Sequence, residues 1–323
     1  MRPRSFPVSL ARAYPGSTTL NREVQHRNRP DGGHGEGSAC IVPAASNRWV
    51  IVHYHIFKNA GSTIEYVLRR AFGGGFATVH GPAPDSVLRQ EDLLSFLASH
   101  PDVLAVSSHH LSYPKPSVSG LIVFDLCFLR DPIQRLWSLY RYLRRVESFD
   151  EVSAAARALP VRQFFELMTE RHPHLVNDVQ VNMIANRGAY TRPPALADLR
   201  VAVDVLRQMS ILGVVDLFDE SLVAAEYFLQ PTFPRLQFQY VMQNAGPALG
   251  PNGGDKETPR EEIGDELYRR LESLNRLDYR LLVRARQEVR RRFALTPRCE
   301  ERLSDFRSRC EALRRAHRQR SAE

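Results

Sequence analysis

The sequence predicts an α/β protein in which a central parallel sheet is flanked by helices and followed by a helical C-terminal extension. Two runs predict the sheet: residues 49–56 and 121–129 are apolar and rich in β-branched side chains, as buried strands are. Segments with apolar residues at helical spacing follow each run, and strands that alternate with helices form parallel sheets covered on both faces. The chain has 323 residues, enough for one large domain or two small ones.

The elements follow from local patterns. Residues 63–72 carry apolar side chains at positions 64, 67, 68 and 71, a helical period, and the glycines at 73–75 end that helix. After the strand at 121–129, Asp131 as N-cap and Pro132 at the first helical position begin an amphipathic helix that runs to Arg145. The remaining predictions are helices at 88–99, 161–171, 174–186, 196–208, 219–229, 260–293 and 299–318, short strands at 103–107 and 211–215, and a loop at 244–259.

Composition divides the chain into three parts. Residues 1–47 are rich in Pro, Gly, Ser, Asn and Arg and lack periodicity, which predicts a flexible leader. Residues 48–293 hold the alternating strands and helices, and residues 294–323 form an Arg-rich helical tail. The start of the chain lacks the apolar stretch of a secretory signal, and no run of about 18 apolar residues occurs. We therefore expect a cytoplasmic protein without a membrane span.

The net charge of +8 is concentrated at the two ends of the chain. Residues 1–48 carry seven arginines against three acidic residues, and residues 286–323 carry twelve against six, which leaves residues 49–285 with a net charge of −2. Nucleic-acid binding is disfavoured, because acidic residues interleave with the arginines of the tail as they do in a solvated helix.

The four cysteines lack CxxC spacing, which disfavours a zinc ribbon.

The first chemical motif is residues 55–64 (HIFKNAGSTI), a strand end, a tight turn and a helix start. Unsatisfied N–H groups and the helix dipole favour an anion at such a point. Gly61 lets the backbone approach a ligand closely, Ser62 and Thr63 offer hydroxyl groups, and Lys58, one of three lysines in the chain, supplies a mobile positive charge. The lysine precedes the glycine, so this is not a Walker A sequence. A helix capped by Ser62 or Thr63 is the plain structural alternative.

The second chemical motif is residues 129–140 (LRDPIQRLWSLY), where another strand leads into a helix. Arg130 lies at the carboxyl end of the strand, where open parallel sheets bind their ligands. Its guanidinium can bind a phosphate through two hydrogen bonds. Ser138 lies two turns into the helix and has to face back toward Arg130 to share that ligand. The structural alternative pairs Arg130 with Asp131 and leaves Ser138 as a surface serine.

Together, and in this order, the two motifs resemble the nucleotide-binding signatures of sulfotransferases that use 3′-phosphoadenosine 5′-phosphosulfate (PAPS). The likeness is strongest to carbohydrate sulfotransferases that include the heparan-sulfate 2-O and 6-O enzymes, whose signatures are similar to H-I-P-K-T-G-G-T-T and L-R-D-P-x-x-R-x-x-S-x-Y. Residues 108–113 (SHHLSY) resemble an S-G-H-F-P-Y segment of that family, and residues 180–185 (QVNMIA) weakly resemble Q-T-R-x-L-A. The likeness covers about residues 49–293, so residues 48–293 are expected to form a sulfotransferase-like catalytic domain.

The resemblance implies a P-loop-like nucleotide-binding fold and transfer of a sulfuryl group from PAPS to a hydroxyl or amine of a carbohydrate or related acceptor, without a metal. Lys58 would neutralise charge on the leaving phosphate, while Gly61, Ser62 and Thr63 would cradle the 5′-phosphate. Arg130 and Ser138 would hold the 3′-phosphate. The complete nucleotide-binding set implied in this way is Lys58, Asn59, Ala60, Gly61, Ser62, Thr63, Arg130 and Ser138.

The acceptor's proton needs a base, and the resemblance points to a histidine. His110 matches the family's histidine, but His109 replaces the glycine before it, so either residue is a candidate. The chain also departs from the family where Asn59 and Ala60 stand in place of threonine and glycine.

Two other functions compete with this interpretation. A P-loop nucleotide kinase is disfavoured by the lysine spacing and by the lack of an obvious Mg²⁺-binding aspartate, and a nucleic-acid- or partner-binding protein would act through the basic tail. The motifs leave the acceptor and the oligomeric state open. Acceptor specificity is expected in the loops at 73–86, 112–119 and 244–259.

Overall fold

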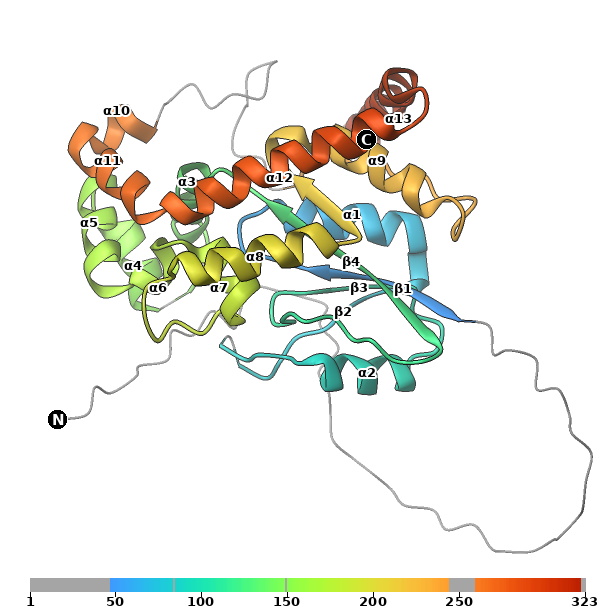
Figure 1. Cartoon of the computed structure of the whole chain (residues 1–323). Helices are drawn as coiled ribbons and strands as arrows, with labels where there is room; N and C mark the ends of the chain where they lie inside the picture. The colour runs from blue at the N-terminus through green and yellow to red at the C-terminus, as the bar shows by residue number, and fades with distance from the viewer. Residues whose placement is uncertain (1–46, 84, 149, 244–258, 321–323) are drawn as a thin grey trace, which may run out of the picture.

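A computed structural model of the chain describes residues 47–83, 85–148, 150–243 and 259–320 (Figure 1). Its five strands pair in parallel in the order β2-β3-β1-β4-β5. This arrangement confirms the predicted α/β class with a parallel central sheet. The strands are β1 (Arg48–Tyr54), β2 (Phe76–Thr78), β3 (Ala105–Ser108), β4 (Leu121–Leu129) and β5 (Ile211–Val214).

The strand register brings the ends of the central strands together. Tyr54 at the end of β1 pairs with Ser108 at the end of β3, and His53 pairs with Leu126 of β4. Because all three strands are parallel, the residues that follow them leave the sheet at the same edge. The two predicted motifs therefore meet at the carboxyl edge of the sheet.

Helices fill the connections between the strands and extend beyond the last one. The structure describes α1 (Gly61–Phe72), α2 (Gln90–Ser99), α3 (Pro132–Leu143), α4 (Glu151–Ala158), α5 (Val161–Arg171), α6 (Pro173–Val176), α7 (Val179–Asn186), α8 (Leu196–Gln208), α9 (Phe218–Leu229), α10 (Pro259–Ile263), α11 (Asp265–Leu274), α12 (Arg276–Leu295) and α13 (Cys299–Arg320).

Side chains that alternate along the strands form a core on each face of the sheet. Val50 and Val52 of β1 pack with residues of α2, α7, α8 and α12, whereas Ile51 packs with residues of α1, α9 and α13. Successive strand residues point to opposite faces, so both faces of the buried strands are apolar. Figure 1 shows α7, α8 and α12 lying alongside one another over one side of the sheet. The sheet is thus the middle of three layers.

A third core lies in a helical lobe beside these layers. Trp137 and Tyr140 of α3 pack against Phe164 and Phe165 of α5, and Leu267 of α11 joins the same cluster. The lobe continues from α3, the helix that begins with the second motif. It therefore supports the site from the side of Arg130.

The Arg-rich C-terminal helix α13 packs on the sheet layers. Leu303, Phe306 and Cys310 are buried in the core that α1 and α9 share. On its polar side, Arg309 forms an ion pair with Glu226 of α9 at 3.1 Å. The helix is thus laced with ion pairs, as its charge pattern predicts, and it also closes part of the core.

Several predicted boundaries were wrong. The predicted helix at 174–186 is two helices, because Asp178 adopts a positive φ of 45° between α6 and α7. The predicted helix at 260–293 is three helices, with breaks at Gly264 (φ 82°) and Asn275. The predicted loop at 73–86 contains strand β2, which extends the sheet beside β3, and helix α4 lies in a segment for which no element was predicted.

Other predictions fall partly or wholly outside the described residues. The leader at 1–47 does so except for Asn47, and the loop at 244–259 does so except for Pro259, the first residue of α10. Among the described helices, none is both long enough and apolar enough to cross a bilayer.

Candidate functional site at the carboxyl edge of the sheet

The turn between β1 and α1 has a constrained backbone. Lys58 and Ala60 both have positive φ values, 69° and 61°, on either side of Asn59. Left-handed conformations cost side-chain-bearing residues about 1–3 kcal/mol, so the surroundings must hold the turn. The Asn59 side chain does this, because its Nδ2 donates to the Phe128 carbonyl oxygen at 2.8 Å and to Gln180 Oε1 at 2.9 Å.

Helix α1 begins at Gly61, two residues before the predicted start at Thr63. Its N-cap is Ala60, which has no side-chain capping bond, and its first turn contains no acidic residue. The caps expected in the structural alternative, Ser62 and Thr63, lie inside the first turn instead, so the predicted identity of the cap was wrong. A helix start that lacks a capping oxygen retains its attraction for an anion.

Lys58, three residues before α1, is a half-buried cation. Its Nζ lies 4.4 Å from the centre of the Tyr142 ring and 5.3 Å from that of Phe57. Burial, together with repulsion from Arg130 and Arg145, lowers the pKa of Lys58 to about 8. The ammonium is therefore mostly protonated at neutral pH and poorly hydrated, which strengthens its attraction for an anion.

Arg130 belongs to the same site. Its guanidinium Nη1 donates to the carbonyl oxygen of Lys58 at 3.1 Å, which joins the second motif to the first. Asp131, the structural alternative as a partner for Arg130, accepts from Gln134 N at 3.0 Å and so caps α3 as predicted. Ser138 lies half-buried two turns into α3, and its predicted contact with the same ligand stays a prediction.

Gln180 is a central residue of the site that was not predicted. Its Oε1 accepts from Asn59 Nδ2 and from the backbone N of Arg130, both at 2.9 Å. Its Nε2 donates to the carbonyl oxygen of Arg130 at 2.9 Å and to Asp278 Oδ2 at 3.3 Å. One buried amide therefore fixes the Lys58 turn and the Arg130 peptide relative to each other. The weak likeness at 180–185 contained this glutamine, but nothing in the sequence showed its contacts.

Gly61 is required by a neighbouring side chain. A Cβ atom added to Gly61 would lie 1.5 Å from Nε2 of His55. Glycine thus makes room for the buried His55 ring, and the predicted close approach of its backbone to a ligand stays a prediction. Thr63 is buried, and its Oγ1 accepts from the backbone N of Gln243 at 3.2 Å, whereas Ser62 is partly exposed.

The two candidate bases differ in their hydrogen bonds. Nδ1 of His110 accepts from Gly81 N at 2.7 Å, so a neutral His110 carries its proton on Nε2. Nδ1 of His109 lies 3.1 Å from the carbonyl oxygen of His55, which can only accept. A neutral His109 therefore carries its proton on Nδ1 and keeps the lone pair on Nε2. Burial lowers the pKa of His109 well below its ordinary value, and the nearby His55 adds to this, so the ring is neutral at neutral pH.

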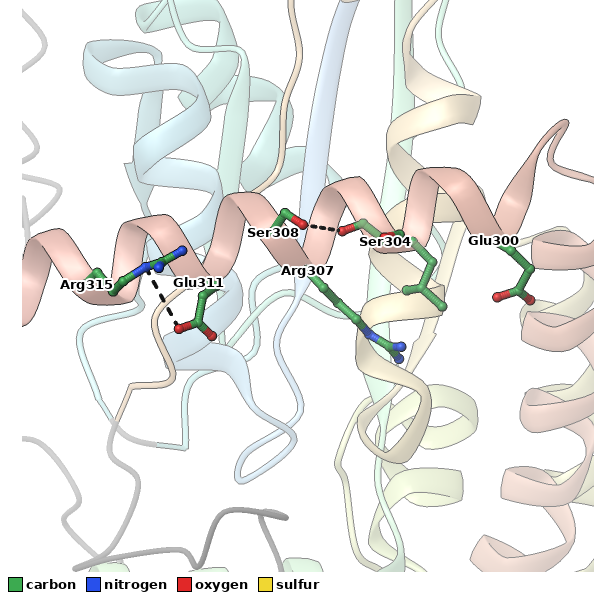
Figure 2. Close-up of a pocket in the computed structure, with 7 residues that line it drawn as sticks. Glu300, Ser304, Arg307, Ser308, Glu311 and Arg315 are labelled. Carbon is green, nitrogen blue, oxygen red and sulfur yellow. Dashed lines mark hydrogen bonds and ion pairs between the residues drawn. The ribbon is translucent and has the colours of Figure 1, made fainter.

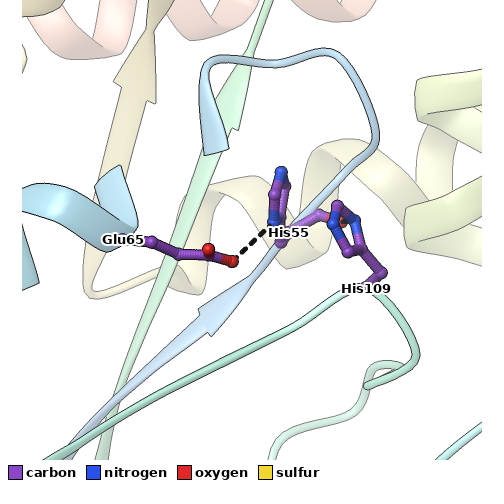
Figure 3. A group of neighbouring side chains, drawn as sticks. All are labelled: His55, Glu65 and His109. Atoms are coloured by element: carbon purple, nitrogen blue, oxygen red, sulfur yellow. Dashed lines mark hydrogen bonds and ion pairs between the residues drawn. The ribbon is translucent and has the colours of Figure 1, made fainter. Parts of the chain in front are cut away.

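A network of polar side chains includes His109, and Figure 3 shows this histidine with two other members, His55 and Glu65. The rings of His55 and His109 lie 3.6 Å apart between centres. Nδ1 of His55 lies 3.1 Å from Oε1 of Glu65 on α1, and the same carboxylate oxygen accepts from Ser107 Oγ at 2.9 Å. His53 Nδ1 in turn lies 2.9 Å from Ser107 Oγ. The sequence pattern gave no signal for Glu65, because its position on α1 becomes relevant only when β3 is placed beside β1.

One hollow lies away from this edge of the sheet, along α13. It encloses about 460 Å³ and is lined by residues that include Glu300, Arg307, Glu311 and Arg315 (Figure 2). These side chains all come from one helix and carry both charges. Such a solvent-open groove excludes little water, so the carboxyl edge of the sheet is the better candidate for chemistry.

The carboxyl edge brings together most of the predicted residues. Lys58, Arg130 and the start of α1 offer positive charge, and His109 offers a neutral ring nitrogen with a lone pair. This arrangement can hold a phosphate-bearing ligand and accept a proton beside it.

Comparison with known proteins gives no family. No protein-family profile matches the chain. An uncharacterized protein of Archaeoglobus fulgidus is 25% identical to this chain over 242 residues, which cover 72% of this chain and 94% of the archaeal protein. The similarity thus extends over nearly the whole archaeal protein, and the function has to be argued from the site.

Proposed function

We propose that the chain is a PAPS-dependent sulfotransferase that transfers a sulfuryl group to a hydroxyl or amine of a carbohydrate or related acceptor. The observation that carries the proposal is the bond from the Arg130 guanidinium to the Lys58 carbonyl oxygen, which joins two motifs 72 residues apart. These are the two motifs that resemble the nucleotide-binding signatures of such enzymes. The P-loop-like identity of the fold is part of the same proposal.

The residues present suit the charge of the nucleotide. Lys58 lies three residues before a helix start that lacks a side-chain cap, and the Arg130 guanidinium donates to the Lys58 carbonyl oxygen. The alternating signs of φ at Lys58, Asn59 and Ala60 are typical of turns whose N–H groups form an anion-binding concavity. PAPS, when bound, supplies the activated sulfuryl group and a phosphate leaving group.

The protein's contribution is positioning and electrostatics. Lys58 would hold its ammonium where negative charge collects on the leaving phosphate, and its partial burial strengthens that interaction. Arg130 would anchor a second phosphate through its guanidinium. Gln180 would fix the positions of Lys58 and Arg130 relative to each other through its hydrogen bonds to Asn59 and to the backbone of Arg130.

We assign the base to His109 in preference to His110. The acceptor's proton would move to Nε2 of His109, which carries the lone pair while Nδ1 is held by the His55 carbonyl oxygen. In His110 the Gly81 N–H occupies Nδ1, so its Nε2 carries a proton and can only donate in the neutral ring. His110 would then serve as a hydrogen-bond donor.

The test starts with binding of the product nucleotide. We expect 3′,5′-adenosine bisphosphate to raise the melting temperature of the full chain, and Arg130→Ala and Lys58→Ala to reduce that shift. Arg207→Ala, which removes an arginine from an exposed ion pair with Asp204, is the matched control and should leave the shift unchanged. A screen of carbohydrate acceptors with labelled PAPS then tests transfer.

Measurements of sulfuryl transfer distinguish the roles of His109 and His110. Once an acceptor is found, His109→Gln should abolish transfer while leaving nucleotide binding intact, and His110→Gln should retain measurable transfer. The absence of any shift with millimolar bisphosphate contradicts the proposal. Stabilisation by Mg·ATP that exceeds stabilisation by the bisphosphate points instead to a nucleotide kinase.

A further inference from the structure

We infer that His55, Glu65 and His109 form a binding site for a divalent cation of the zinc class (Figure 3). The three side chains come from the turn after β1, from α1 and from the end of β3. Two imidazoles and one carboxylate form a ligand set that zinc uses when its fourth position is left to water or substrate.

The spacing of the ligand atoms suits such an ion. One ring nitrogen of each histidine and one carboxylate oxygen all lie within 4.8 Å of one another. Bonds of about 2.0–2.1 Å in a tetrahedral site place neighbouring ligand atoms about 3.4 Å apart. Nδ1 of His55 and Oε1 of Glu65, at 3.1 Å, already have nearly this separation. The rings of His55 and His109, whose centres lie 3.6 Å apart, would rotate out of their nearly stacked arrangement to direct both lone pairs at one ion.

The surrounding groups hold the ligands as outer-shell partners do. The carbonyl oxygen of His55 accepts from Nδ1 of His109 at 3.1 Å and orients that ring with its lone pair on Nε2. Ser107 Oγ donates to Glu65 Oε1 at 2.9 Å and fixes the carboxylate. Bonds of this kind set the tautomer and direction of metal ligands and strengthen metal binding.

The charge balance also admits a cation. Burial keeps both imidazoles neutral, the form that binds metals, and Glu65 adds one negative charge. Lys58 opposes a second cation, but its ammonium is directed to the rings of Tyr142 and Phe57. The borderline-soft nitrogen ligands select Zn²⁺, Co²⁺ or Ni²⁺ over Mg²⁺ or Ca²⁺.

An ion at this site would occupy His109, the residue that we propose as the base. Metal binding and proton acceptance at His109 are then mutually exclusive, so zinc would inhibit transfer. The metal site itself does not depend on the proposed function, because it rests on the three ligands alone.

The test measures zinc binding without any nucleotide. Metal-free full-length protein is titrated with Zn²⁺ by calorimetry at neutral pH, and its melting temperature is followed with and without Zn²⁺. We expect one equivalent to bind and to stabilise the fold, and Glu65→Gln and His109→Gln each to weaken binding by about 100-fold. His109→Gln also serves as the second variant if Glu65→Gln does not fold.

His174→Gln is the matched control, because His174 also lies beside another histidine, with ring centres 5.9 Å apart, but lies on α6. It should bind zinc as the wild type does. Absence of binding in the wild type overturns the inference, and so does equal zinc affinity in the wild type, Glu65→Gln and His109→Gln proteins. In either case the hydrogen bond between His55 and Glu65 accounts for the cluster without a metal.

Discussion

Asp178 and Asp278 cap each other's helices. Oδ1 of Asp178 accepts from the backbone N atoms of Leu277 and Asp278 at 2.8 and 2.9 Å, at the start of α12. Asp278 accepts from the backbone N atoms of Gln180 and Val181 at 3.0 and 2.8 Å, at the start of α7. This exchange fixes α7 against α12 and thereby positions Gln180 under the candidate site.

The pair makes stability depend on pH. Burial, with repulsion from Asp278, raises the pKa of Asp178 to about 7. Between about pH 4 and pH 7 the folded chain therefore holds a proton there that the unfolded chain has lost, so this group's contribution to stability falls as pH rises. We expect Asp178→Asn, which keeps an acceptor oxygen, to flatten that fall in urea unfolding from pH 4 to pH 8. Identical pH slopes for the two proteins would show that Asp178 ionises normally.

Replacing Gln180 should disturb both the fold and the site. Gln180→Leu removes the partner of the Arg130 backbone N–H and carbonyl oxygen and one of the two acceptors of Asn59 Nδ2, which should cost about 3 kcal/mol of unfolding free energy. Gln208→Leu, at an exposed position on α8, is the matched control and should change stability by less than about 0.5 kcal/mol. Equal effects of the two substitutions on chemical unfolding would refute a central role for Gln180.

Gly61 and His55 should behave as a coupled pair. Gly61→Ala forces a Cβ into the His55 ring and should destabilise the chain by more than about 2 kcal/mol. In the double variant with His55→Ala the clash is absent, so the two substitutions should be non-additive by more than about 1 kcal/mol. Gly74→Ala, where a Cβ meets no atom within 4 Å, is the control. Additive effects in this cycle would mean that the contact is not limiting.

Anion binding should follow the protonation of Lys58. Because the pKa of Lys58 is about 8 and the phosphates of 3′,5′-adenosine bisphosphate are nearly fully charged above about pH 7, the affinity should fall as pH rises from about 7 to 9. Lys58→Arg keeps its charge throughout, so its affinity should be nearly independent of pH in calorimetric titrations over the same range. The same decline in both proteins would assign the titration to another group.

Helix α13 should contribute to global stability. Phe306 is fully buried, and Phe306→Ala should lower the unfolding free energy by about 3–5 kcal/mol. Arg315→Ala, on the same helix but largely exposed, should have little effect. A small effect of Phe306→Ala would instead indicate a tail that folds apart from the sheet.

Much of the sheet was predictable because its strands are local and strongly patterned. The run at 121–129 became β4 with the same bounds, and Asp131 caps α3 as expected. Strand β2 escaped prediction because three residues are too few to show a period. The helix breaks at Asp178 and Asn275 were not predicted, because they accompany hydrogen bonds between Asp178 and the start of α12, about 100 residues away in the sequence.

The candidate site was likewise predicted only in part. Lys58, Arg130 and the histidine pair stand out because each follows a strand, and parallel strands end at one edge. Gln180 and Glu65 were missed because their partners, such as Asn59 and Ser107, are distant in sequence. The choice between His109 and His110 depends on Gly81, which lies in a loop whose path no local pattern defines.

The bonds of Gln180 also bear on the entropy of binding. Since one amide holds the Arg130 peptide at both its N–H and its carbonyl oxygen, and also holds Asn59, the turn and the strand end are ordered before any ligand arrives. A ligand that binds there loses little free energy to ordering the backbone. We therefore expect the backbone at residues 55–63 and at Arg130 to move by less than about 1 Å between the free and liganded states.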